Sequence, residues 1–137
     1  YKTERYNIKG KDVVAGNCKY YLNDLSFKNF LYPGFAYGVG YLLENAVYLE
    51  LRRLGYIVYT GSFRDKEVDF VAMKDDRVIY LQATYMLETA QTMEREYAPL
   101  LTIGDNYEKY VVSMDEVQFP SNEGVRHIQA WNLKEIL

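Results

Sequence analysis

The segment KEVDFVAMKDDRVIYLQATY (residues 66–85) places polar side chains within two strands that are otherwise largely apolar. Residues i and i+2 of a strand share one face. Glu67 and Asp69 are therefore predicted on one face of the first strand, and Gln82 and Thr84 on one face of the second. Carboxylate, amide and hydroxyl groups on a half-buried hairpin are costly unless they are paired or bind a ligand. The pattern predicts a polar site on this hairpin.

The turn between the two strands sets their register. A tight turn pairs Lys74 with Arg77, and counting back from that pair places Asp69 directly opposite Gln82. Directly opposed residues have Cβ atoms about 5 Å apart. The two side chains could then offer oxygen atoms to one cation, and oxygen ligands suit Mg²⁺. Strict alternation along the first strand puts Val68 on the face opposite Asp69.

A long helix predicted over residues 39–54 carries two carboxylates of interest, Glu44 and Glu50. Glu50 falls near the middle of the apolar stripe, so it either pairs with a buried arginine or belongs to a site. Glu44 falls at the edge of the stripe, where it is either solvated or directed toward the hairpin. The stripe consists of Val39, Leu42, Leu43, Ala46, Val47 and Leu54.

The elements that must position these residues follow from periodicity and from turn residues. Gly55 is the expected cap of the long helix. Further helices are predicted over 23–31, 89–101 and 133–137, and strands over 3–9, 18–22, 56–62, 66–74, 77–85, 109–114 and 125–131. This order predicts a three-layer α/β domain with a mixed central sheet flanked by helices.

Composition narrows the class of protein further. The chain has 137 residues and a net charge of −3, with a pI near 5.2, which argues against strong non-specific binding of nucleic acid by this chain alone. The single Cys18 excludes an internal disulfide and suits a reducing cytoplasm. The single His127 is expected at the surface or in a strand. No apolar run reaches membrane-spanning length. Because the chain starts at Tyr1 in mid-pattern, we interpret it as part of a longer chain.

Three segments in this order resemble the PD-(D/E)xK nuclease superfamily. They are GYLLENAVYLELRRLGY (residues 40–56), EVDFVA (67–72) and IYLQATY (79–85). The similarity covers roughly residues 18–135. It is strongest to the nuclease-like C-terminal domain, largely of unknown function, that is found on bacterial and archaeal AAA-type ATPases.

The resemblance implies a fold and a set of metal ligands. It implies a restriction-endonuclease-like core within one nuclease-like domain, with 1–35 as a lead-in segment and 36–137 as the core. Glu44, from the first helix of the core, and Asp69, from its second strand, correspond to metal ligands. The implied metal is Mg²⁺.

The third motif of the superfamily is a carboxylate, any residue and then a lysine, and here it falls on Gln82, Ala83 and Thr84. Gln82 keeps an oxygen ligand without the charge. Thr84 replaces a lysine that, in active members, orients the attacking water and stabilises charge on the phosphate. Loss of such a positioned donor commonly lowers the rate by about 10²–10³-fold. The other cations considered for its place are Lys66, Lys74, Arg77 and Arg95. In the helix after the motif, Arg95 is either a phosphate contact or part of a solvated charge run.

Two functional hypotheses follow. The first is a non-catalytic module that binds DNA or protein for an attached ATPase, which the absence of lysine at residue 84, the low pI and 15 tyrosines favour. The second is a Mg²⁺-dependent phosphodiesterase acting on DNA, with Glu44, Asp69 and Gln82 holding the metal. The expected partners are an upstream ATPase domain of the same chain, DNA and a second copy of the chain in a homodimer.

Overall fold

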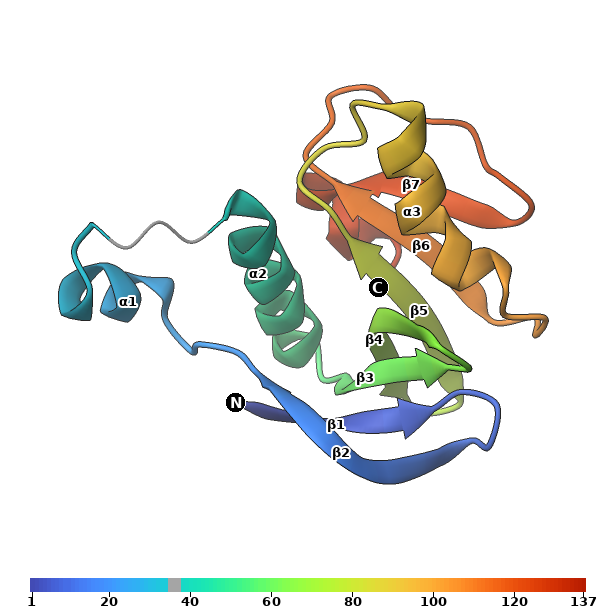
Figure 1. The fold of residues 1–137 in the computed structure, drawn as a ribbon, viewed down its shortest axis with the longest axis horizontal. Coiled ribbons are helices and arrows are strands. Elements are labelled where there is room, and N and C mark those ends of the chain that lie inside the picture. Colours follow the sequence, from blue (N-terminus) through green and yellow to red (C-terminus); the bar gives the residue numbers. More distant parts are fainter. Residues whose placement is uncertain (35–37) are drawn as a thin grey trace.

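One mixed sheet organises the chain (Figure 1), as seen in a computed structural model that describes residues 1–34 and 38–137. The strand order is β2-β1-β3-β4-β5-β6-β7. The strands are β1 (Lys2–Asn7), β2 (Asp12–Tyr20), β3 (Ile57–Phe63), β4 (Lys66–Lys74), β5 (Arg77–Ala83), β6 (Glu108–Ser113) and β7 (Val125–Gln129). The helices are α1 (Leu25–Leu31), α2 (Val39–Arg53), α3 (Ala90–Leu101) and a 3₁₀ helix, η1 (Ala130–Glu135).

The predicted α/β class and the mixed sheet flanked by helices are confirmed, with differences at both ends of the chain. β2 begins at Asp12 and not at residue 18, because it pairs with β1 as an antiparallel neighbour as far as Asn7. β1 in turn pairs in parallel with β3. The first twenty residues, expected to lie in a lead-in outside the core, therefore contribute two strands to the sheet. The last helix is a 3₁₀ turn that starts three residues earlier than expected.

Two hydrophobic clusters cover the two faces of the sheet and give the fold its three layers. The first packs α2 and η1 against the sheet through Leu43, Val47, Tyr48, Leu51 and Leu133, over Phe70, Ala72, Ile79 and Leu81. The second packs α3 on the opposite face through Tyr97 and Leu100, over Val68, Val71, Tyr80 and Val111.

The long helix α2 ends as predicted, with Gly55 in the left-handed region at φ +88°. Its buried face is rotated from the predicted stripe. It contains Leu43, Val47, Tyr48 and Leu51, whereas Val39 and Ala46 are exposed. Glu50 therefore lies beside the buried face and pairs with Arg53 one turn later, with a side-chain contact of 2.6 Å. This pairing supports the structural role for Glu50, with the difference that its arginine is exposed.

His127 lies in β7 and is buried at 3% exposure, so the expectation of a strand position is confirmed and that of a surface position is wrong. Its Nε2 lies 2.8 Å from Ser113 Oγ, and its Nδ1 accepts a hydrogen bond from the Phe119 amide at 3.2 Å. Burial lowers the pKa of His127, opposed by Asp115. The histidine thus joins β6, β7 and the loop between them.

In the described part of the chain, no helix is both long enough and apolar enough to cross a membrane.

Candidate functional site

A β-bulge in β4 determines where Asp69 points. The pairing of β3 with β4 shifts by one residue between Tyr59 and Gly61, which pair with Val71 and Val68 respectively. Val68 and Val71 consequently enter the same core cluster under α3, although strict alternation would place them on opposite faces. The predicted alternation of β4 is therefore wrong at this point. Bulges commonly redirect one side chain, and here that residue is Asp69.

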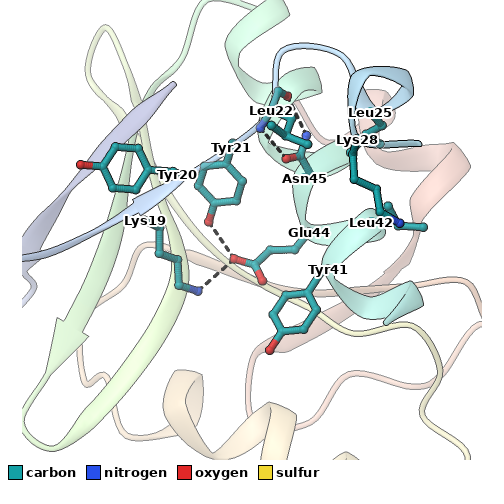
Figure 2. A pocket seen from close by; sticks show the side chains of 10 residues that line it. All are labelled: Lys19, Tyr20, Tyr21, Leu22, Leu25, Lys28, Tyr41, Leu42, Glu44 and Asn45. Atoms are coloured by element: carbon teal, nitrogen blue, oxygen red, sulfur yellow. Dashed lines mark hydrogen bonds and ion pairs between the residues drawn. The ribbon is translucent and has the colours of Figure 1, made fainter. Parts of the chain in front are cut away.

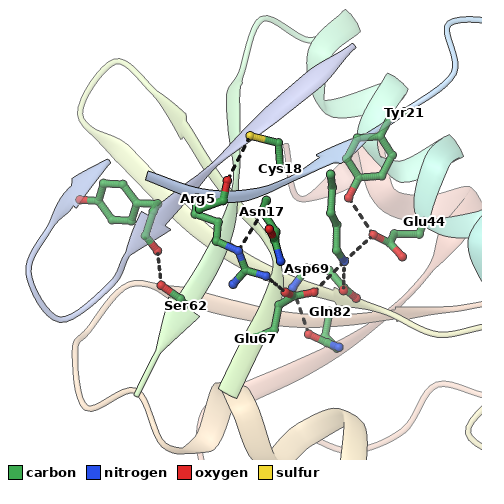
Figure 3. Close-up of polar contacts among 12 residues, drawn as sticks. Arg5, Asn17, Cys18, Tyr21, Glu44, Ser62, Glu67, Asp69 and Gln82 are labelled. Atoms are coloured by element: carbon green, nitrogen blue, oxygen red, sulfur yellow. Dashed lines mark hydrogen bonds and ion pairs between the residues drawn. The ribbon is translucent and has the colours of Figure 1, made fainter. Parts of the chain in front are cut away.

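Asp69 and Gln82 lie beside each other where β4 and β5 end their pairing (Figure 3). The predicted register is confirmed by the pairs from Lys74–Arg77 back to Phe70–Leu81, but the pairing ends before the predicted Asp69–Gln82 pair. Asp69 Oδ2 accepts the Ala83 amide at 3.0 Å, and the Asp69 amide donates to Gln82 Oε1 at 3.2 Å. The side-chain oxygen of Gln82, which was expected to bind a metal, thus accepts a hydrogen bond from the backbone at the bulge.

The amide nitrogen of Gln82 donates toward the α3 side of the sheet, to Glu96 Oε2 at 3.3 Å. Glu96 is itself buried at 7% exposure, and it pairs with Arg95 at 2.7 Å. Arg95 is largely exposed, and it is linked to Gln82 through Glu96, which both side chains contact. The charge run on α3 is therefore partly buried, and it connects to the hairpin through Glu96.

Three carboxylates meet at the ammonium of Lys19. Lys19 Nζ lies 2.9 Å from Glu44 Oε1, 3.0 Å from Glu67 Oε1 and 3.2 Å from Asp69 Oδ1. Figure 2 shows Lys19 and Glu44 facing each other from β2 and α2, and Figure 3 shows Glu67 and Asp69, which both come from β4. Glu67 also pairs with Arg5 of β1 at 2.5 Å. The structure thus brings Glu44 and Asp69 to one centre, together with Glu67.

The chain at the end of β2 is fixed against α2, and this contact positions Lys19. Asn45 is buried, accepts the Leu22 amide at 2.8 Å and donates to the Leu22 carbonyl at 2.9 Å. Tyr21 donates to Glu44 Oε1 at 2.7 Å, and its ring stacks on Tyr48 with centroids 4.2 Å apart. Tyr21, one residue beyond the end of β2, and Lys19 both donate to Glu44 Oε1.

The electrostatics of the cluster reflect burial and an excess of carboxylates. Burial and the nearby charge of Glu44 raise the pKa of Asp69 to about 6, against the opposing effects of Lys19 and the Ala83 amide. Burial alone would lower the pKa of Lys19, but Asp69 and Glu44 outweigh it and raise that pKa. Lys19 is therefore an ammonium ion at neutral pH.

Thr84 and Arg77, which the sequence also suggested, have other partners. Thr84 is buried, and its amide donates to the Val112 carbonyl at 3.0 Å. Arg77 pairs with Glu108 at 3.0 Å, at the opposite end of the hairpin. The cation at the centre is Lys19, which was not among those considered. It lies 25 residues from Glu44 and 50 from Asp69 in sequence, and its i, i+2 spacing with Tyr21 is the weak signal that could have indicated a shared face.

Carboxylate oxygens are ligands that suit Mg²⁺, although here they surround the ammonium of Lys19. Among the described residues, no group of three or more histidine, cysteine or acidic side chains is preformed for a metal. The Lys19 Nζ position nevertheless lies 2.9–3.2 Å from three carboxylate oxygens. These are distances to an ammonium, and they are longer than the roughly 2.0–2.1 Å at which Mg²⁺ binds oxygen. Glu44 and Asp69 are the carboxylates that could hold the ion.

A cavity of about 490 Å³ opens beside the cluster (Figure 2). Glu44 and Lys19 line it, and so do Tyr20, Tyr41 and Lys28. The polar centre is therefore adjacent to a space that a ligand could enter.

Comparison with known proteins identifies a relative. An uncharacterised protein of Haemophilus influenzae is 34% identical over 113 residues, which cover 82% of this chain and 28% of the relative. No family model matches the sequence. No solved structure matches it either. The chain thus spans little more than a quarter of the length of this relative.

Proposed function

We propose that this chain is a restriction-endonuclease-like domain that binds Mg²⁺ and hydrolyses phosphodiester bonds in DNA. The observation that carries the proposal is the convergence of Glu44, Glu67 and Asp69 on one cationic centre between α2 and the middle strand β4. The order of α2, the β3–β4–β5 strands and α3, with a carboxylate on α2 and another on β4, supports the same assignment.

The charge balance of the cluster favours a binding role over a purely structural one. Three carboxylates meet two cations, Lys19 and Arg5, in a partly buried environment. Gathering like charges in this way costs stability, and such groups concentrate at functional sites. A divalent cation bound by Glu44 and Asp69 would balance the excess charge and act as a Lewis acid on a phosphoryl oxygen. Gln82 would support Asp69, because its side-chain oxygen accepts a hydrogen bond from the Asp69 backbone amide.

The test compares two glutamates of the same helix. We expect Glu44→Gln to lower Mn²⁺ affinity in isothermal titration at least tenfold and to abolish Mg²⁺-dependent cleavage of duplex DNA. Glu50→Gln is the matched control, because Glu50 contacts Arg53 and not the cluster, and it should leave both properties unchanged. Equal Mn²⁺ binding by the wild type and Glu44→Gln would exclude Glu44 as a ligand.

A second candidate function is a non-catalytic module that docks on another domain of a longer protein, such as an AAA-type ATPase. The observation that favours it is α1, which contains no buried residue. Phe27, Phe30 and Leu31 are 61%, 82% and 61% exposed on this helix. Contiguous apolar surface of this kind commonly marks an interaction site. That the relative is much longer than this chain is consistent with such a neighbour.

Hydrogen exchange tests the docking proposal. We expect the α1 amides to exchange rapidly in this chain alone and to be protected in a longer protein that carries the domain, because docking would cover Phe27 and Phe30. Phe30→Glu should remove that protection and leave the fold unchanged. Identical exchange in both proteins would contradict the docking proposal, and protection that rises with the concentration of this chain alone would point to a second copy instead.

A further inference from the structure

Lys19 has an environment that a simple structural ion pair does not need. Its ammonium has three hydrogen-bond donors, and carboxylate oxygens from Glu44, Glu67 and Asp69 lie within reach of all three. One carboxylate would suffice to neutralise a lysine that serves only packing. The three carboxylates come from α2 and β4, whereas Lys19 comes from β2, at the edge of the sheet.

The position of Lys19 also allows its ammonium to move. Its side chain is 28% exposed and lines the same 490 Å³ cavity as Glu44 (Figure 2). A lysine ammonium sits on a flexible four-carbon stem and can be redirected without moving the backbone. The backbone itself is held close by, through the two hydrogen bonds between Asn45 and Leu22. The Lys19 ammonium can therefore move while the nearby backbone stays in place.

We propose that Lys19 is the phosphate-binding cation of this site, and that it competes with the divalent cation for Glu44 and Asp69. The inference rests on the proposed function. While all three donors of the ammonium are held by carboxylates, none is available to a phosphate oxygen. A divalent cation on Glu44 and Asp69 frees two of these donors, while Glu67 can keep the third. The ammonium can then bind a non-bridging oxygen of a phosphodiester beside the cavity.

This assignment supplies the charge that residue 84 lacks. Thr84 has a neutral hydroxyl and is buried after β5, so it cannot neutralise a phosphate. In hydrolysis, the oxygen of water bonds to phosphorus, the bond from phosphorus to one ester oxygen breaks, and a proton of water passes to that oxygen. Negative charge grows on the phosphoryl oxygens during this step. An ammonium positioned there stabilises the charge.

Lys19→Met tests the proposal with effects of opposite sign. We expect its Mn²⁺ affinity in isothermal titration to rise about tenfold, because the competing ammonium is gone. We expect its affinity for a short DNA duplex in Ca²⁺, measured by fluorescence anisotropy, to fall about tenfold. Cleavage in Mg²⁺ should fall about 100-fold. Lys9→Met is the matched control, since Lys9 is exposed in the turn between β1 and β2, and all three properties should match the wild type.

Lys19→Arg and Lys19→Gln separate charge from folding. The arginine variant keeps the charge and should retain most of the duplex affinity, whereas the glutamine variant should behave like Lys19→Met. A lower Mn²⁺ affinity in folded Lys19→Gln would mean that Lys19 assembles the carboxylates and would overturn the competition. Duplex binding and cleavage equal to the wild type would overturn the phosphate role alone. A wild-type protein that neither binds Mn²⁺ nor cleaves DNA would overturn the proposed function, and this inference with it.

Discussion

Asp69→Asn is expected to lower Mn²⁺ affinity at least about 100-fold and to eliminate Mg²⁺-dependent cleavage. Asp69 is 8% exposed, and its Oδ1 lies 3.2 Å from Lys19 Nζ, which also contacts Glu44. The bulge in β4 holds Asp69 there. Asparagine keeps the size of the side chain but removes the negative charge that a hard divalent cation requires. Loss of a direct ligand should exceed the 10–100-fold effect typical of residues that only support the ligands. Isothermal titration with Mn²⁺ measures the change.

Stability provides the check that the Asp69→Asn variant is folded. Removing the charge relieves repulsion from Glu44, but it leaves either Lys19 or the Ala83 amide without a full acceptor. These effects oppose each other, so the free energy of unfolding should stay within about 1 kcal/mol of the wild type. Asp76→Asn, in the exposed turn of the same hairpin, is the control and should change neither property. Wild-type Mn²⁺ affinity in a folded Asp69→Asn variant would remove Asp69 from the site.

Gly61→Val is expected to lower the free energy of unfolding by about 3 kcal/mol, as overpacking of a closed core does. A Cβ at residue 61 would lie 2.8 Å from Val71 Cγ2, 3.0 Å from Ile8 Cδ1 and 3.0 Å from Val68 Cβ. Val68 and Val71 flank the bulge that carries Asp69, so their displacement should also disturb the carboxylate cluster. Urea unfolding followed by circular dichroism measures the first effect.

Gly104→Ala is the matched control for this substitution. A Cβ at residue 104 meets no heavy atom within 4 Å, so the unfolding midpoint should change little. Gly61→Ala should fall between the two, because it adds the clashing Cβ without the two methyl groups of valine. An unchanged midpoint for Gly61→Val would mean that β1, β3 and β4 can separate at this point without cost, contrary to their close packing.

Local geometry made much of this fold predictable. The bounds of β4 match the predicted strand, and α2 ends within one residue of its prediction, because strand alternation and the glycine cap depend only on neighbouring residues. The turn after Lys74 likewise fixed the hairpin register. The rotation of the buried face of α2 was missed, because the aromatic Tyr48 belongs to the core and the small Ala46 does not. The periodicity of apolar residues alone does not show which of them pack against another element.

The sequence by itself determined which elements form, and it determined that Glu44 and Asp69 are carried by a helix and a strand of the central layers. Only the tertiary structure decided what surrounds them. Lys19 reaches the cluster because β1 pairs in parallel with β3 and brings β2 to the same side of the molecule as α2. Gln82 turns from a ligand into a support because the bulge frees the Asp69 amide. Contacts between residues 25 and 50 positions apart depend on strand order and on a single inserted residue, and neither leaves a local pattern in the chain.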